Sequence, residues 1–316
     1  MAVVKRQLSE ADFKAFVSGL PYPPNKFQME ILRSIASGEG NILVNALAGS
    51  GKTTLLMQCA ALLKKMGVPG SDVLFVAFNV KIADEMNERL PAGFKAINSH
   101  KIGNAVLRQH GRQGKTKISR KKWKDICTPI VSRPASGYME DSYKASKMLE
   151  NLCSKAMLSN LKLVNLTSDE RVVLPDKLMD IAVHFSIVTE ENHAMVEDLI
   201  HYVPEAMEKA KQIFESTGEI MFDEMLYWPV ALNMPFPKYQ YIFVDECQDL
   251  NGLQQQIILR SSKAQDSRMV FVGDSKQSIY GFAGADAKSF SRIQTLTNAS
   301  VLPLNICYRC PSSHLD

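Results

Sequence analysis

The stretch NALAGSGKTT, residues 45–54, is the feature of this sequence that most restricts the fold. It fits the pattern of a small residue, four variable positions and Gly-Lys-Ser/Thr, with Ala46 where the first glycine usually stands. A short apolar run, residues 41–45, precedes this stretch, and a helical pattern, residues 54–65, follows it. The sequence therefore predicts a buried strand, a phosphate-binding loop and a helix that together hold a nucleoside triphosphate.

The loop offers two kinds of contact to a bound triphosphate. Consecutive backbone N–H groups and the positive end of the helix dipole are expected to surround the β- and γ-phosphates. The Lys52 ammonium adds a point charge there, and the Thr53 hydroxyl is expected to be a Mg²⁺ ligand. The residues expected to bind the nucleotide are Ala46, Gly49, Ser50, Gly51, Lys52, Thr53 and Thr54.

Length and composition limit the remaining possibilities. A chain of 316 residues suits two domains, or one domain with a large insertion, and a hydrophobic content of 46% is ample for a core. A net charge of +4 is too small to indicate a polyanionic partner by itself. No stretch reaches the roughly 18 apolar residues of a membrane span, so a soluble, cytoplasmic protein is expected. The pair Cys307 and Cys310 has no second pair or histidines nearby and gives only weak support for zinc.

Alternating strand and helix patterns occupy two separated stretches of the chain. Apolar runs separated by helical patterns in residues 25–100, and again in residues 218–316, indicate a parallel sheet that is buried on both faces. Residues 101–217 lack strand-like runs and are rich in helix formers. We therefore expect an α/β domain, residues 1–100 and 218–316, that is interrupted by a mostly helical insertion, residues 101–217.

The insertion begins with a basic run, residues 112–124, which carries seven Lys/Arg and no acid. Such a run can release counterions from a DNA backbone, or it can be a solvated charged loop, and the sequence favours neither. The insertion is accordingly a candidate DNA-binding region.

Acidic residues end two of the predicted strands. Asp245 and Glu246 follow the run YIFV at the carboxyl edge of the sheet, where open α/β sheets bind their ligands. An aspartate there can hold Mg²⁺ through its water shell, and an adjacent glutamate can orient and deprotonate the attacking water. In the loop after the second strand, the amide of Gln277 suits a sensor of the γ-phosphate because it can both donate and accept. Tyr280 and Phe282 in the same loop are either core anchors or platforms on which bases stack.

Taken in order, these segments resemble superfamily 1 DNA helicases of the UvrD/Rep type. The resemblance covers nearly the whole chain except the insertion, and its phosphate-loop, DECQDL and GDSKQSIY motifs together are very specific. The segments that carry it are FQMEI (27–31), ALAGSGKTT (46–54), FVAFNVKIADEMNERL (75–90), NSHKIG (98–103), FDEML (222–226), VDECQDLN (244–251), VGDSKQSIYGFAGA (272–285) and LNICYRCP (304–311). It implies a RecA-like motor domain that binds ATP and Mg²⁺, and an insertion that rides on this domain and holds the duplex junction.

The resemblance also implies a role for each matching residue. Gln28 is expected to read adenine, and Tyr308 is expected to stack on it. Gln277 couples the γ-phosphate to the DNA site, and Arg309 is an arginine finger that compensates charge in the transition state. The catalytic residues implied are Lys52, Asp245, Glu246, Gln277 and Arg309, with Mg²⁺ held by Thr53 and Asp245. The residues expected to face single-stranded DNA are Phe78, Asn79, Ser99, His100, Tyr280 and Phe282.

The function that the resemblance implies is ATP-driven movement along single-stranded DNA, 3′→5′, with unwinding of a duplex. In the family a second RecA-like domain closes the other side of the ATP cleft, and the present sequence stops soon after Arg309. We expect the chain to be part of a longer polypeptide, in preference to receiving the second domain from another chain. The alternative function is an ATP-gated, single-stranded DNA-binding module without unwinding. A small-molecule kinase is disfavoured because it has no use for DECQDL and GDSKQSIY.

Overall fold

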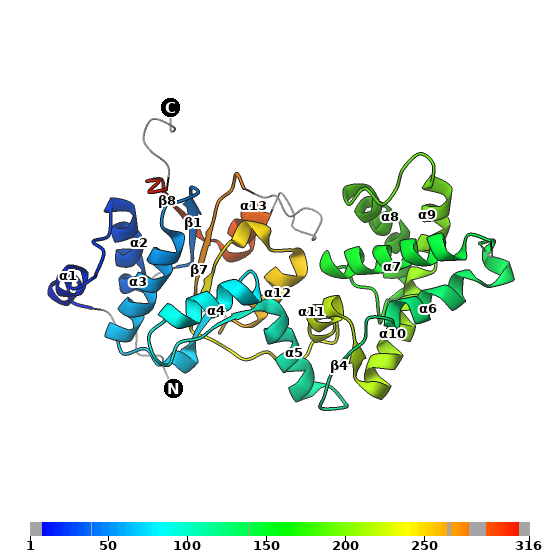
Figure 1. Cartoon of the computed structure of the whole chain (residues 1–316), viewed down its shortest axis with the longest axis horizontal. Coiled ribbons are helices and arrows are strands. Elements are labelled where there is room, and N and C mark those ends of the chain that lie inside the picture. The colour runs from blue at the N-terminus through cyan, green and yellow to red at the C-terminus, as the bar shows by residue number, and fades with distance from the viewer. Residues whose placement is uncertain (1–7, 39, 139, 264–266, 278–288, 310–316) are drawn as a thin grey trace.

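The computed structural model describes residues 8–38, 40–138, 140–263, 267–277 and 289–309 (Figure 1). Within these residues a six-stranded sheet has the order β3-β2-β6-β7-β1-β8, and every neighbouring pair is parallel. The strands are β1 (Ile42–Ala46), β2 (Val73–Ala77), β3 (Ala96–Asn98), β6 (Tyr241–Val244), β7 (Arg268–Gly273) and β8 (Ser300–Leu304). The predicted α/β fold class with a parallel sheet is confirmed.

The sheet is buried on both faces because successive strand residues point into two different hydrophobic clusters. Ile42 and Val44 belong to one cluster, and Leu43 between them belongs to the other. The helices that contribute to the first cluster are α1 (Glu10–Ser18), α2 (Lys26–Ser37), α3 (Lys52–Lys65) and α4 (Val80–Arg89). Those that contribute to the second include α5 (Ser99–His110), α11 (Phe222–Ala231), α12 (Gly252–Arg260) and α13 (Ser289–Thr297).

A second group of helices lies to one side of the sheet (Figure 1). It consists of α6 (Lys122–Val131), α7 (Ser142–Leu158), α8 (Ser168–His184), α9 (His193–Ile200) and α10 (Val203–Thr217). The short strands β4 (Lys117–Ile118) and β5 (Glu219–Ile220) pair in parallel beside it. The sequence analysis found no strand in residues 101–217, because a two-residue strand such as β4 leaves no periodic signal. The remaining elements are 3₁₀ turns, η1 (Gly70–Asp72), η2 (Pro134–Ser136) and η3 (Cys247–Asp249).

Helices α5 and α11 lie between this group and the sheet (Figure 1). Leu226 and Trp228 of α11 are fully buried in a hydrophobic cluster that also contains Leu43 of the sheet. The Trp228 ring stacks on the ring of Phe214 in α10, with centroids 5.9 Å apart. One apolar cluster therefore runs from the sheet face into the helical insertion. None of the described helices is both long and apolar enough to cross a membrane.

Candidate active site

The phosphate-binding loop connects β1 to α3 and turns at two glycines. The φ angle is +72° at Gly49 and +86° at Gly51, a left-handed region that glycine occupies without steric cost. Gly51 is the N-cap of α3, and no described side chain caps the first N–H groups of this helix. These N–H groups, with the positive end of the helix dipole, are therefore available to phosphate oxygens.

Residues 307–309 pack directly on this loop. The N–H of Tyr308 donates to the carbonyl of Gly49 at 2.9 Å. A Cβ atom on Gly49 would lie 2.6 Å from the Cβ of Arg309, so only glycine permits this approach. The two segments enclose a cavity of about 310 Å³ that is lined by Gly49, Gly51, Lys52, Thr53, Thr54, Glu246, Tyr308 and Arg309. The structure thus brings together, around one cavity, most of the residues that the sequence analysis assigned to the nucleotide.

Three residues assigned to the nucleotide do not line this cavity. Ala46 is fully buried at the end of β1. Ser50 is also fully buried, and its hydroxyl has no hydrogen-bond partner among the described residues. Gln28 is buried in α2, and a Cβ atom on Gly51 would lie 3.4 Å from its Nε2.

Lys52 and Glu246 meet inside the cavity. The Lys52 ammonium lies 2.5 Å from Oε2 of Glu246, and the two side chains are 12% and 28% exposed. Glu246 follows β6 with φ of +48°, an uncommon conformation for a residue other than glycine. This turn brings its carboxylate from the sheet edge to the phosphate-binding loop.

Asp245 directly follows β6 and is buried, with 5% of its surface exposed. Burial, reinforced by the negative charge of Glu246, raises the pKa of Asp245 to about 6, although the charge of Lys52 opposes the shift. A divalent cation would stabilise a carboxylate in so poorly solvated a place. Asp245 and the Thr53 hydroxyl are oxygen donors, and Mg²⁺ needs few protein oxygens because it keeps water and phosphate ligands. The residues present therefore fit a Mg²⁺ ion that is bound together with a nucleotide.

A glutamine that the sequence analysis did not single out links Glu246 to the next strand. The Gln248 amide group donates to Oε2 of Glu246 at 3.0 Å, and its Oε1 accepts from the N–H of Asp274 at 3.1 Å. Gly273 permits this contact, because a Cβ there would lie 2.4 Å from Oε1 of Gln248. Asp274 begins the loop that carries Gln277, whose side chain is exposed and whose N–H donates to the Asp274 carbonyl. Gln248 therefore connects the carboxylate in the cavity to the loop after β7.

Asn25 joins the two residues that are expected to contact adenine. Its Oδ1 caps α2, and in return Oε1 of Gln28 accepts from the N–H of Asn25 at 3.0 Å. The Asn25 amide also donates to the hydroxyl of Tyr308 at 2.8 Å. The sequence signal for this residue was present, because asparagine three positions before glutamine at a helix start is a capping box.

Four of the residues expected to face DNA, Phe78, Asn79, Ser99 and His100, lie just after β2 and β3. Phe78 is half-buried, and Asn79 is exposed and caps α4 by accepting from the N–H of Ile82. His100 contacts Phe222 in an edge-to-face arrangement with ring centroids 6.4 Å apart. Burial lowers the pKa of His100, although the charge of Asp223 opposes the shift.

Ser99 departs from the expectation, and three further residues of the sequence analysis lie outside the described residues. The Ser99 side chain is only 2% exposed, because the residue sits at the junction of β3 and α5 rather than on the surface beside His100. Tyr280, Phe282 and the second cysteine of the Cys307/Cys310 pair fall outside the described residues, so their predicted roles stay predictions.

Comparison with known proteins identifies the family. Residues 25–298 match the model of the UvrD/REP helicase N-terminal domain. The chain belongs to this family. It is 24% identical over 279 residues to a putative ATP-dependent DNA helicase, YjcD, of Bacillus subtilis, a match that covers 84% of the chain and 34% of the relative. It is 25% identical over 310 residues to DNA helicase II of Haemophilus influenzae, covering 89% of the chain and 38% of the relative.

An F-box DNA helicase protein 1 of Schizosaccharomyces pombe is also similar, with 26% identity over 276 residues that cover 80% of the chain and 27% of that protein. The chain therefore spans about a third of the length of these UvrD/Rep-type relatives.

The structure divides the basic run of this UvrD/Rep-family chain into exposed and buried parts. Lys122 and Trp123 are buried, with 1% and 5% of their surfaces exposed, because they begin α6 and face the insertion core. Neither is available to a DNA backbone in this structure. The exposed basic residues of the run are Arg112, Lys115, Lys117, Arg120, Lys121 and Lys124.

Proposed function

We propose that this chain is the ATP-hydrolysing motor portion of a DNA helicase that moves along single-stranded DNA. The observation that carries the proposal is the contact of Lys52 with Glu246 in a cavity that Tyr308 and Arg309 also line. It supports phosphoryl transfer, because a phosphate-binding lysine and a carboxylate meet where the loop N–H groups converge. Membership of the UvrD/REP helicase family and the DNA helicases among the relatives support DNA as the polymer along which the chain moves.

In the proposed reaction, the chain positions ATP and the water that attacks it. The N–H groups at the start of α3 and the Lys52 ammonium hold the phosphates, so Lys52 exchanges the carboxylate of Glu246 for phosphate oxygens. Glu246 is then released to orient the attacking water and to accept its proton. Mg²⁺, held by Thr53 and Asp245, would neutralise phosphate charge.

Separate residues are proposed to bind the adenine and to compensate charge in the transition state. Gln28 and Tyr308, linked through Asn25, would hold the base. Arg309 would approach the γ-phosphate. Tyr308 is 62% exposed and Arg309 is also exposed, which leaves this margin open to a second motor domain. We propose that such a domain completes the cleft and that the assembled motor moves 3′→5′.

The proposed DNA surface lies at the ends of β2 and β3, on the same sheet edge as the nucleotide. His100 and Phe222 present paired rings there, and Phe222 is 53% exposed, so a base can stack on it. The exposed basic residues of 112–124 are proposed to contact the phosphate backbone of the duplex. Gln248 connects Glu246 to Asp274, where the loop that carries Gln277 begins.

The test is ATP hydrolysis with and without single-stranded DNA, comparing the chain with its Glu246→Gln variant. We expect DNA to stimulate turnover, and Glu246→Gln to lower kcat by about 10²–10⁴-fold, the usual contribution of a general base. Glu191→Gln, at an exposed position on the insertion, is the matched control and should leave turnover unchanged. ATP-dependent DNA binding without turnover would instead identify a nucleotide-gated DNA-binding module. The absence of both binding and turnover would refute the proposal.

A further inference from the structure

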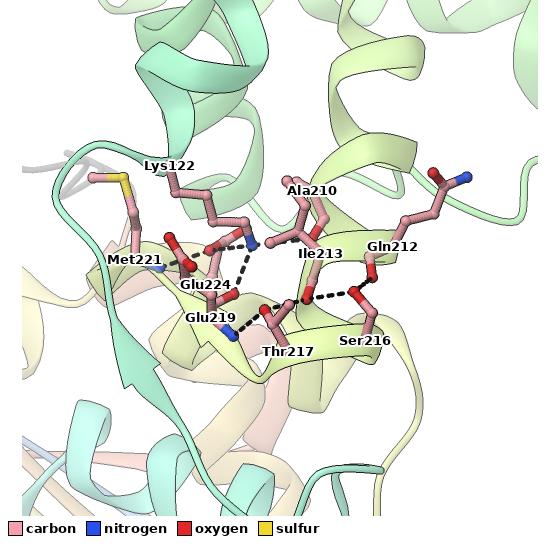
Figure 2. A network of polar contacts seen from close by, with 9 residues as sticks. All are labelled: Lys122, Ala210, Gln212, Ile213, Ser216, Thr217, Glu219, Met221 and Glu224. Carbon is pink, nitrogen blue, oxygen red and sulfur yellow. Dashed lines mark hydrogen bonds and ion pairs between the residues drawn. The ribbon is translucent and has the colours of Figure 1, made fainter.

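A lysine of the insertion and a glutamate of α11 form a buried ion pair. The side chains of Lys122 and Glu224 are both fully buried, and the Lys122 ammonium lies 2.8 Å from Oε1 of Glu224. Figure 2 shows that the same ammonium also points at two backbone carbonyls, of Ala210 in α10 and Glu219 in β5, at 3.0 and 2.9 Å. All the donors of the ammonium therefore have partners.

The pair lies where the chain leaves the sheet domain and where it returns. Lys122 begins α6, directly after β4, and Glu224 lies in the first turn of α11, directly after β5. Because β4 and β5 also pair with each other, the departing and returning segments are joined twice. We call these two segments, residues 117–122 and 219–224, the neck.

Three consecutive residues at the start of α11 contact three different parts of the protein. The Phe222 ring meets the ring of His100, which follows β3. Asp223 accepts a hydrogen bond from the hydroxyl of Ser154 in α7. Glu224 accepts from Lys122 and also from the N–H of Met221 at 2.6 Å, which closes the first turn of the helix. Glu224 and Phe222 therefore lie in the same first turn of α11.

Apolar packing would hold the neck together at lower cost than this ion pair. Burial opposes both charges: it lowers the pKa of Lys122 and raises that of Glu224, and each partner counteracts the effect on the other. Well-packed apolar residues in place of a buried ion pair are often as stable or more stable. The ion pair differs from apolar packing because its hydrogen bonds are directional. They link α6 to α10, β5 and α11 in one geometry.

We propose that Lys122 and Glu224 are positioning residues for nucleic-acid binding: they hold the first turn of α11 so that Phe222 and His100 form one platform for a base of single-stranded DNA. This inference rests on the proposed function for its ligand. It assigns Lys122 a role distinct from that of its exposed basic neighbours, which are free to contact phosphates. Lys122 acts through Phe222 and does not touch DNA.

The test compares three variants of the full chain by two measurements. Lys122→Met removes one charge, and Lys122→Met/Glu224→Gln removes both while keeping an acceptor for the Met221 N–H. Lys177→Met removes an exposed lysine on α8 and controls for net charge. The measurements are amide hydrogen exchange over residues 219–226, with α3 as the internal reference, and affinity for a fluorescent oligothymidylate, with and without Phe222→Ala.

We expect both Lys122 variants to exchange faster over residues 219–226 but not in α3. We also expect them to weaken oligothymidylate binding by about tenfold, the scale of one lost stacking contact. In the Phe222→Ala background they should cause no further loss, because the effect passes through that ring. Lys177→Met should change neither quantity.

Three results would overturn the inference: unchanged exchange over residues 219–226, equally faster exchange in α3, or the same loss of affinity in the Phe222→Ala background. The first shows that the pair fixes nothing, and the second shows general destabilisation. The third shows that Lys122 acts independently of Phe222. If the unmodified chain binds no oligothymidylate, the proposed function is wrong whatever the variants do. The exchange data alone then decide whether the ion pair holds α11 in place.

Discussion

The ammonium of Lys52 lies 2.5 Å from the carboxylate of Glu246, so the lysine of the phosphate-binding loop is paired with the proposed general base. The two residues come from the ends of β1 and β6, strands that are not neighbours in the sheet. Because β7 lies between those strands, the contact joins segments that follow two non-adjacent strands. A triphosphate must replace Glu246 as the partner of Lys52 before the carboxylate can act on water.

Replacement of Lys52 by methionine is expected to abolish most turnover. The change removes the positive charge at the phosphates but keeps a side chain of similar length, so ATP hydrolysis should fall by about 10²–10³-fold. Steady-state hydrolysis measures the effect. Lys65→Met, an exposed position in the last turn of the same helix, should retain normal turnover. Equal activity of both variants would rule out the assigned role of Lys52.

Gly49→Ala is expected to displace residues 307–309 as well as strain the loop. The added Cβ would lie 2.6 Å from Arg309 Cβ, and the φ of +72° is unfavourable for alanine. Gly38 has nearly the same φ, +75°, but a Cβ there would meet nothing within 4 Å. Each substitution should lower the free energy of unfolding by about 1 kcal/mol, but only Gly49→Ala should weaken ATP binding. Calorimetry of unfolding and of ATP binding tests both statements; normal ATP affinity in Gly49→Ala would contradict the packing of residues 307–309 on the loop.

The carboxyl group of Asp249 should make stability depend on pH. Burial and the charge of Glu246 raise the pKa of Asp249 to about 6, above its value in the unfolded chain. Between these two pKa values the folded state holds a proton that the unfolded state has released. The contribution of Asp249 to the free energy of unfolding is therefore largest at low pH and is lost as pH rises through about 6. Asp249→Asn does not titrate. The variant should therefore gain about 1 kcal/mol relative to the unmodified chain between about pH 5 and pH 7.

Thermal unfolding in EDTA at the two pH values measures this difference for Asp249→Asn. EDTA removes divalent cations, which would otherwise bind the neighbouring carboxylates. A difference between variant and unmodified chain that is the same at both pH values would show that Asp249 folds with an ordinary pKa.

Asn25→Ala is expected to weaken ATP binding in addition to destabilising α2. Loss of an N-cap costs about 1 kcal/mol of folding free energy, and here the hydrogen bond to the Tyr308 hydroxyl is lost as well. Thr167→Ala removes the equivalent capping box of α8, far along the chain in the insertion. The two variants should lose similar stability in thermal unfolding, whereas only Asn25→Ala should require more ATP for half-saturation. A shared loss of ATP affinity would show that the effect is only one of stability.

Local sequence patterns were enough to predict the parallel sheet and the phosphate-binding loop. The run before Ala46 is strong because β1 is buried on both faces, and the pattern after Thr53 is strong because α3 is long enough to show a helical period. The pairing of Lys52 with Glu246 was not predicted, because it depends on the order of strands, which a single sequence does not contain. The sequence also did not show which basic residues are exposed. Lys122 reads as part of a charged run, and only its partner Glu224, distant in the sequence, explains its burial.

The strand order has a consequence for how the chain reaches its fold. β1 and β2 are both made early, but β6 and β7 lie between them in the sheet, and these strands follow the whole helical insertion in the chain. Sheets closed by such distant pairings form slowly, since a long loop must be ordered first. Helices α6 to α10, whose contacts are local, can therefore fold while β2 still lacks β6 and β1 still lacks β7 and β8. A nascent chain arrested before Tyr241 would expose the edges of β1 and β2, and unpaired strand edges invite aggregation.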